Sequence, residues 1–600
     1  MRLLGVYFLL SDVMILWAAS RGISARNNWK DYILLFPFPL VVIVFLLLFA
    51  EVTLLYYFLS PLRKALGEVL DPAILIIGAM FFSCILVWRA DDFRLSVILG
   101  LFAMVFVVYG GSRLSGKRLL SEARPYVTAS LVAAASIAVF LFICQTALAI
   151  HRTYGTSTFD MGIFEQMYYN MSHGFRAVTT CERGYALSHF RVHSSFILYL
   201  LLPFYALVPG AETLIVLQAL IVVSGVIPVY LISKKRGFAG TALFCSCMLY
   251  LFSLGILSPC YFHFHENAFL PPLLLWLLYA SETKKNILFY VMSALICIVK
   301  EDATLFVMCV CLYLAFEEKG NDRRKAWITG CAALLYFLVA GALLARSGDG
   351  EMIMSSRMHT MMIDKNQSAT EVLRNILLNP GHALDLFVSE KNAFVIFLEM
   401  MIPLLFLPFV TRKIHRLFLM VPFCTFNLLI GSAYTYASQI QYHYAFGTAT
   451  LLIYLALINL SDLDKEKRNL ITVAAGVVSV ITAISLISPN LSTYERYTKN
   501  KAKYQQIEDC LEKIPADASV TSADKYLPHL ARREEIYALM DESFVVSGNV
   551  VMQLKVEETD FFVLDLREDR QVRSCEILKS RGYEEYARCE DELVIFVRSA

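Results

Sequence analysis

Long apolar stretches alternate with short polar ones along the first 490 residues of the chain. Most of them approach the roughly 17–25 residues that a helix needs to cross a bilayer. The pattern predicts about 15 to 16 apolar spans. They are residues 3–19, 32–59, 73–88, 95–110, 127–150, 194–208, 213–232, 241–257, 269–280, 287–299, 305–316, 327–344, 395–410, 417–430, 448–459 and 470–488. The sequence therefore predicts an all-α polytopic membrane protein.

After about residue 490 the pattern changes, because charged residues crowd in and the apolar runs shorten to the length of strands. Strands are predicted at 518–521, 535–539, 561–566 and 593–597, and a helix at 568–581. This pattern indicates a small α/β domain with a modest core of its own. We therefore divide the chain into accessory membrane helices (1–126), a membrane core (127–489) and a soluble domain (490–600).

The composition agrees with a membrane protein. The chain is 58% hydrophobic and 17% charged, whereas soluble domains are typically about 45–50% apolar. A formal net charge of +2 gives no reason to expect a nucleic acid as a partner. Most of the 14 cysteines lie inside apolar runs and are expected to be core residues. Cys575 and Cys589 lie in polar segments, where a disulfide and two free thiols are equally compatible with the pattern.

Basic loops set the predicted orientation, because lysine and arginine are enriched on the cytoplasmic side of a membrane. The clearest are residues 113–124, 234–236, 284–285, 323–325, 412–416 and 465–468. With these inside, the loops 151–193 and 345–394 and the C-terminal domain are extracytoplasmic. One segment does not fit, because residues 194–232 hold two apolar runs but must cross only once. Either one run does not cross completely, or the loop at 234–236 breaks the charge rule.

Candidate chemistry first appears in the polar and aromatic loop 151–193. Charged groups at a membrane surface are costly to desolvate and usually serve chemistry or transport. Asp160 and Glu165 lie close together in this loop, with Gly162 between them. Asp160 is suited to act as a general base on a hydroxyl, or to ligate a cation that holds a phosphate. The same residue is also suited to cap a helix that begins near Ile163.

Two more candidates, His189 and Arg191, lie near the end of this loop. The guanidinium group could bind a phosphate in a bidentate way, and the imidazole could share a proton. The alternative is that both are interfacial residues that extend toward the lipid headgroups.

Three further polar clusters interrupt the apolar runs. They contain His265 with Glu266, Lys300 with Glu301 and Asp302, and Tyr442 with His443. A glutamate at the depth of Glu266 favours a functional polar lining. Lys300 suits an anionic phosphate, or else forms an internally neutralised group with the two acids that follow. The tyrosines suit sugar rings and equally suit an interfacial belt. No third ligand accompanies the histidines, so no metal site is predicted.

With these residues in place, the chain resembles domain of unknown function 2079, a family of polytopic bacterial and archaeal membrane proteins. The resemblance covers about 127–600. It rests on residues 159–166, 189–190, 264–266, 271–275, 300–302, 379–380, 390–391, 442–444, 514–520 and 527–530. This chain has Val192 where family members often have a proline. That family in turn resembles a branch of the GT-C glycosyltransferase superfamily, whose members transfer a sugar from a polyprenyl-phosphate carrier on the extracytoplasmic face.

The resemblance implies a multi-pass glycosyltransferase of the cell membrane. Its partners would be membrane lipids, a lipid-linked sugar donor, and a glycan, lipid or protein acceptor. No cofactor is certain, and a divalent cation such as Mg²⁺ or Mn²⁺ stays open because some superfamily members use one. By position, Asp160 matches the essential acid of the superfamily, and Glu165 is the near alternative.

The resemblance also suggests roles for the other polar residues. Lys300, with Arg191 as a helper, would stabilise the phosphate leaving group. His265, Glu266 and His443 would line the pocket for the sugar or the acceptor. Two further classes compete with an enzyme: a non-enzymatic lipid or solute transporter, and a structural cell-envelope protein with an inactive core. A transporter would have charged residues at broken helices and repeat symmetry between its halves, and no such repeat is evident.

Overall fold

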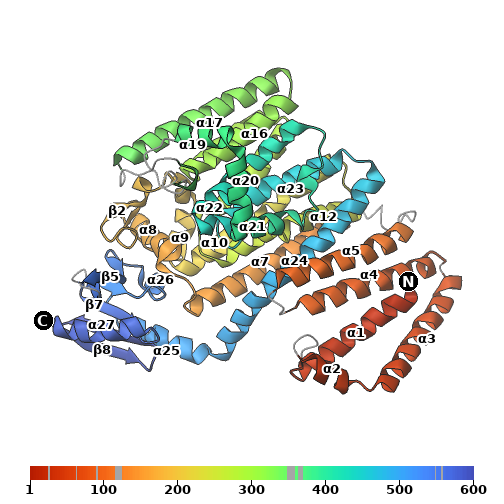
Figure 1. Ribbon diagram of the computed structural model, residues 1–600, viewed down its shortest axis with the longest axis horizontal. Coiled ribbons are helices and arrows are strands. Elements are labelled where there is room, and N and C mark those ends of the chain that lie inside the picture. Colours follow the sequence, from red (N-terminus) through yellow and green to blue (C-terminus); the bar gives the residue numbers. More distant parts are fainter. Residues whose placement is uncertain are drawn as a thin grey trace.

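The computed structural model describes residues 1–23, 28–62, 64–88, 92–114, 125–347, 359–362, 369–546, 549–555 and 559–599. The N-terminal part contains the helices α1 (Arg2–Ser20), α2 (Trp29–Leu35), α3 (Phe38–Leu62), α4 (Lys64–Val87) and α5 (Phe93–Leu114). These helices form the red and orange-red edge of the molecule in Figure 1. They join the rest mainly where α4 and α5 pack along α24 (Lys465–Lys499). The side chains between α4, α5 and α24 form a small buried apolar cluster.

The membrane core consists of helices that run back and forth around one large hydrophobic cluster. They are α7 (Pro125–Arg152), α10 (Ala211–Ser224), α11 (Val226–Lys235), α12 (Gly240–Leu251), α13 (Leu254–Leu257), α14 (Leu270–Glu282), α15 (Asn286–Cys297), α16 (Thr304–Glu317), α17 (Gly320–Ser347), α21 (Lys391–Met401), α23 (Ala445–Ser461) and α24. The prediction of a helical, multi-pass membrane protein is confirmed.

Among the described residues, eight helices are long and apolar enough to cross a membrane, or up to nine if a pair bent by 48° counts as one span. The sequence pattern predicts more because several apolar runs form shorter helices. For example, α15 has 12 residues and α14 has 13. The run 417–430 forms the 3-10 helix η9 (Ile414–Met420) and the π-helix η10 (Phe423–Ile430). Such irregular backbone is tolerated where neighbouring protein, rather than lipid, surrounds it.

The structure also resolves the ambiguity in residues 194–232. The first apolar run forms only η3 (Phe196–Leu200) and α9 (Leu202–Leu207), which have five and six residues. At 1.5 Å per residue neither could cross a bilayer. The second run forms the continuous pair α10 and α11, which is 25 residues long. One run therefore does not cross, and the charge rule needs no exception.

Five of the six predicted basic loops gather at one end of the helical core, and residues 115–124 of the sixth lie outside the described residues. Contacts join them to one another or to neighbouring loops: Arg236 to Glu282, Lys284 to Glu318, Lys413 to Glu317, Arg416 to Asp462, and Arg468 to the carbonyl of Gly237. The opposite end carries the loop 151–193 and the C-terminal domain (Figure 1). In the second long loop, 345–394, the described part contains α19 (Ala369–Leu378) and α20 (Pro380–Ser389). Residues 348–358 and 363–368 of that loop lie outside the described residues.

The C-terminal domain contains a five-stranded sheet in the order β4-β3-β7-β9-β8. Its strands are β3 (Val520–Ser522), β4 (Ile536–Ala538), β7 (Phe561–Asp565), β8 (Tyr583–Cys589) and β9 (Leu593–Arg598). The pairs β4–β3 and β3–β7 are parallel, and the pairs β7–β9 and β9–β8 are antiparallel. Beside the sheet lie α25 (Lys501–Leu511), α26 (Leu527–Leu530), α27 (Asp569–Ser580) and a hairpin of β5 (Met540–Val546) and β6 (Asn549–Lys555). The four predicted strands and the predicted helix are confirmed, whereas β8 and the hairpin were not predicted. All fourteen cysteines are free, so Cys575 and Cys589 form no disulfide.

The C-terminal domain and the loop 151–193 share one hydrophobic core. Tyr154, Ile163 and Cys181 of the loop belong to the same buried cluster as Cys510 and Leu527 of the domain. The loop also pairs with strand β4, because the Thr180 hydroxyl donates to the Ile536 carbonyl over 2.6 Å. The division of the chain at 126 and 490 stays a prediction.

Candidate functional site

Asp160 lies in a strained turn, η1 (Thr158–Gly162), where its φ is +68° and its ψ is −71°. Such a conformation costs an L-residue on the order of 1–3 kcal/mol and persists only where the surroundings enforce it. The helix that follows, α8 (Ile163–Ser172), confirms the predicted helix but has Gly162 at its N-cap and no side-chain cap. The interpretation of Asp160 as a helix cap is therefore wrong, because the turn directs its carboxylate elsewhere.

The turn is held from two sides. The His263 Nδ1 donates to the Phe159 carbonyl over 3.0 Å, and the Ser157 amide donates to the His263 Nε2 over 3.3 Å. Burial lowers the pKa of His263 to about 4, which keeps the ring neutral and able to both donate and accept. From the other side, the Thr158 amide donates to the Asp524 carboxylate of the C-terminal domain over 2.8 Å.

The Asp160 carboxylate faces a pair of histidines. Its Oδ2 lies 3.9 Å from the Nδ1 of His443, whose ring stacks on that of His265 with centroids 3.3 Å apart. Although 26% of the Asp160 side chain is exposed, burial, followed by the charge of Glu266, raises the pKa of Asp160 to about 7. Both protonation states are therefore populated near neutral pH.

A buried ion pair lies next to these histidines. The Lys300 Nζ lies 3.9 Å from the Glu266 Oε1, which also accepts a hydrogen bond from the Ser195 hydroxyl over 3.2 Å. Burial acts to lower the pKa of Lys300, but the carboxylates of Asp302 and Glu266 outweigh it and raise that pKa. The ammonium group therefore stays charged at neutral pH. Asp160 senses both charges, since Glu266 raises its pKa and Lys300 lowers it.

Glu266 has unused acceptor capacity. Its Oε2 is buried and, among the described residues, has no hydrogen-bond partner. The nearby His265 Nδ1, 3.3 Å away, accepts from the Asn267 amide and so cannot donate to Glu266 at the same time. Burial also lowers the pKa of His265 well below its usual value, so the ring is neutral. A buried carboxylate oxygen without a partner is suited to accept a hydrogen bond from a hydroxyl group of a ligand.

The remaining candidates have structural contacts or lie at the edge of the cluster. Glu301 accepts from the His193 ring over 2.9 Å and from the Ser194 amide over 3.0 Å. Burial opposes its charge, but His193 outweighs this effect and lowers the pKa of Glu301 to about 2. His189 is buried against Glu182, with 3.1 Å between its Nδ1 and the Oε2. The contacts of Glu301 fix the end of the loop 151–193 to the helical core, whereas the contact between His189 and Glu182 lies within the loop.

Arg191 and Tyr442 differ in their surroundings. Arg191 ends the short 3-10 helix η2 (His189–Arg191), and its side chain is exposed and forms no ion pair with the described residues. Tyr442 is half-buried, with its ring edge-on to Phe262 and Tyr436 at 4.7 and 4.9 Å. Because Phe262 stacks on His263, this aromatic group lies beside the Asp160 turn.

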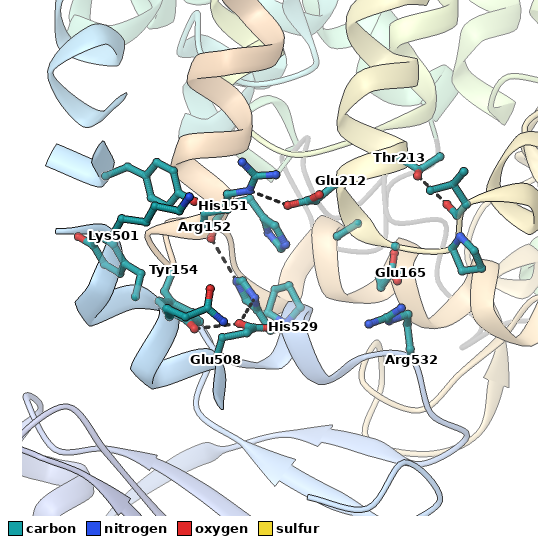
Figure 2. Close-up of a pocket in the computed structure, with 18 residues that line it drawn as sticks. His151, Arg152, Tyr154, Glu165, Glu212, Thr213, Lys501, Glu508, His529 and Arg532 are labelled. Atoms are coloured by element: carbon teal, nitrogen blue, oxygen red, sulfur yellow. Dashed lines mark hydrogen bonds and ion pairs between the residues drawn. The ribbon is translucent and has the colours of Figure 1, made fainter. Parts of the chain in front are cut away.

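Glu165 lies apart from the Asp160 cluster. It is 1% exposed, accepts from the Tyr205 hydroxyl over 2.9 Å, and lines a cavity of about 330 Å³ (Figure 2). Burial raises the pKa of Glu165 to about 7. Asp160 does not line this cavity. The two acids that the sequence offers as alternatives thus have different surroundings, and only Asp160 lies beside Glu266 and Lys300.

Three residues that organise the site were not predicted from the sequence. Gln218 donates to the His263 carbonyl and accepts from the His265 amide, over 3.0 and 2.9 Å. A glutamine within an apolar run was the available signal. Ser195 and Asp524 carry no comparable signal, because their roles depend on chain segments far apart in sequence. In the part of the chain that the structure describes, no group of three His, Cys, Asp or Glu residues could hold a metal ion.

Comparisons with known proteins place these observations in a family. No curated protein matches the chain. Two crystal structures of ArnT from Cupriavidus metallidurans, in the apo state and bound to undecaprenyl phosphate, are similar at 11% identity, with TM-scores of 0.47 and 0.45. Each alignment covers 79% of this chain and 98% of the other. The family described as predicted membrane protein (DUF2079) matches residues 151–594, which include the Asp160 turn and most of the C-terminal domain. The chain belongs to this family of membrane proteins.

Proposed function

We propose that this protein is an integral membrane glycosyltransferase that transfers a sugar from a polyprenyl-phosphate-linked donor to an acceptor on the extracytoplasmic face. One observation carries the proposal: a partly exposed acid with a pKa near 7 lies beside a buried, charged lysine at one end of a membrane bundle. A general base works best when its pKa is near the working pH. A fixed cation stabilises a leaving group whose negative charge grows in the transition state.

Each residue has a role in the proposed reaction. Asp160 takes the proton as the oxygen of the acceptor hydroxyl attacks the anomeric carbon. The bond between that carbon and the phosphate oxygen breaks, and its electron pair stays on the lipid phosphate. Lys300 stabilises the negative charge on this phosphate, and the Glu266 Oε2 accepts a hydrogen bond from a hydroxyl group of the sugar. Tyr442 and His443 supply surface for the sugar ring.

The extracytoplasmic orientation is part of the proposal. It is supported by the gathering of the basic loops at the end of the core opposite the loop 151–193. A donor carried by a lipid phosphate needs no cytosolic nucleotide, which suits a site on that face.

The proposal is tested by Asp160→Asn, which keeps the shape of the side chain but removes the base. We expect a strain that carries this variant to lack the glycan or glycolipid that the wild type adds, with transfer reduced about 10²-fold or more. Mass spectrometry of envelope glycans and of lipid-linked sugars would measure both the product and the accumulated donor. Asp509→Asn, on the exposed face of α25, is the matched control and should behave like the wild type.

Two outcomes would count against an enzyme. If the folded Asp160→Asn variant restores all glycans to a deletion strain, a structural role is supported instead. If deletion leaves glycans intact but changes the distribution of a lipid across the membrane, a transporter is supported.

A further inference from the structure

The cavity beside Glu165 lies where the C-terminal domain meets the membrane core (Figure 2). Its walls come from the end of α7, the start of α10, the first turn of α8, and the helices α25 and α26. Its volume of about 330 Å³ lies within the range of small-molecule sites. None of Asp160, Glu266 and Lys300 lines it, so it is separate from the proposed catalytic cluster.

Some of the charges around the cavity neutralise one another. The Arg152 Nε lies 2.7 Å from the Glu212 Oε1. Glu508 accepts from the Tyr154 hydroxyl over 3.0 Å and pairs with His529, whose Nδ1 is 3.2 Å from the Glu508 Oε2. These contacts form one wall and need no ligand.

The other charges are not paired. Glu165 is 1% exposed, and its Oε2 has no hydrogen-bond partner among the described residues. Arg532 lies opposite Glu165 in Figure 2. Within the described ranges, neither Arg532 nor Lys501 forms an ion pair. A carboxylate and two cations that face one cavity without direct contact fit a ligand that carries both a negative and a positive group.

One side of the cavity is apolar. Val208 and Pro209 line it, and Val208 is 64% exposed. The preceding helix α9 exposes Leu207 and Phe204, so a strip of apolar side chains leads away from the opening. In a membrane protein such a strip contacts lipid chains. A polar cavity that opens onto an apolar strip is suited to an amphiphile, with its headgroup inside and its chains outside.

We propose that this cavity binds the headgroup of a zwitterionic phospholipid. The phosphate contacts Arg532, the ammonium group contacts the Glu165 Oε2, and the acyl chains lie along α9. The site goes beyond the proposed transferase activity and does not depend on it. Because the cavity joins α7 and α10 to α25 and α26, an occupied site would tie the C-terminal domain to the membrane surface.

The test measures binding to the purified full-length protein in detergent. The probes are dihexanoyl phosphatidylethanolamine, dihexanoyl phosphatidylglycerol, which lacks the ammonium group, and inorganic phosphate. We expect saturable binding of the ethanolamine lipid, weaker binding of the glycerol lipid, and little binding of phosphate. Arg532→Ala should weaken the binding of both lipids about tenfold, since it removes a charge-assisted contact with the phosphate. Glu165→Gln should weaken the binding of the ethanolamine lipid only. Arg581→Ala, an exposed change elsewhere in the same domain, should alter neither.

Several results would overturn the proposal. Equal lipid affinities of the Arg532→Ala and Arg581→Ala variants would show that the lipid does not bind in this cavity. Phosphate that binds as tightly as the lipid, and loses affinity in Arg532→Ala, would assign a free anion instead. Thermal unfolding would show whether Glu165→Gln folds. If it does not, a wild-type protein with no preference for ethanolamine over glycerol would exclude the ammonium contact.

Discussion

Asp160 combines a strained backbone with a carboxyl group that titrates near neutrality. Its usual pKa of 3.8 is raised to about 7. A general base acts in its charged form, so kcat/KM of transfer should rise with pH as Asp160 loses its proton. The charged fraction grows from about one tenth at pH 6 to about nine tenths at pH 8. A pH profile of kcat/KM measures this, and a flat profile between pH 6 and pH 8 would contradict it.

The same profile gives an internal control. Glu266 raises the pKa of Asp160 through its charge. In Glu266→Gln, the acidic limb of the profile should therefore move to lower pH, even if the maximum rate falls. An unchanged limb would mean that another group titrates.

His263 is expected to act as a positioning residue. His263→Phe keeps a buried ring but removes both hydrogen bonds to the turn, so Asp160 can relax out of place. Transfer should fall by up to about 10²-fold, because a small misplacement of a catalytic group is costly. The acidic limb of the pH profile should shift as well. His173→Phe, at the exposed C-cap of α8, is the control. An unchanged pH profile in His263→Phe would reduce the role of His263 to packing.

For single residues, the sequence identified the residue types of the candidate site but not which of them lie together. Asp160, Glu266, Lys300 and His443 come from segments up to 283 positions apart, and only the packed helices bring them together. The capping interpretation of Asp160 failed because Asp160 adopts a positive φ, which is uncommon at residues other than glycine. The roles assigned to these residues stay predictions.

At the scale of elements, the turn η1 and the helix α26 are in close contact. A Cβ added at Gly162 would lie 2.5 Å from the Leu527 Cδ2. Gly162→Ala should therefore destabilise the protein by about 1–3 kcal/mol through overpacking. Leu527→Ala is itself destabilising because Leu527 is fully buried, but in that background Gly162→Ala should cost less than in the wild type, because the clashing methyl group is gone. Thermal unfolding measures both effects.

A suitable control for this pair lies in α5. A Cβ at Gly111 would meet no atom within 4 Å, so Gly111→Ala should leave the unfolding temperature nearly unchanged. If Leu527→Ala adds its own loss to that of Gly162→Ala, the clash is not the cause.

The elements differed in how far the sequence could predict them. Long apolar runs were predicted correctly because lipid imposes a length on them. The run 194–208 was misleading, since its apolar residues cover the core near the loop instead of spanning the membrane. Strand β8 was missed because most of its residues are exposed, and only Tyr583 and Cys589 at its ends are buried. An edge strand of this kind lacks the alternation that identifies half-buried strands.

At the scale of the whole molecule, one end of the core carries the basic loops, and the other carries the loop 151–193 and the C-terminal domain. We expect an alkaline phosphatase fused after Ala600 to be active outside the cell. A fusion after Asp462, in a loop at the basic end, should be inactive, with a difference of about tenfold or more. Phosphatase activity of intact cells measures this, and fluorescent-protein fusions at the same points, which should be bright only at Asp462, serve as the control. Equal activity at both points would refute the orientation.

The shared core of the loop 151–193 and the C-terminal domain limits how this protein can be taken apart. A truncated chain that ends before the last 110 or so residues would leave Tyr154, Ile163 and Cys181 without their apolar neighbours. Chimeras between relatives would face the same problem. The smallest exchangeable module therefore consists of the loop 151–193 and the C-terminal domain together. An exchange of only one of them would pair apolar surfaces that do not fit.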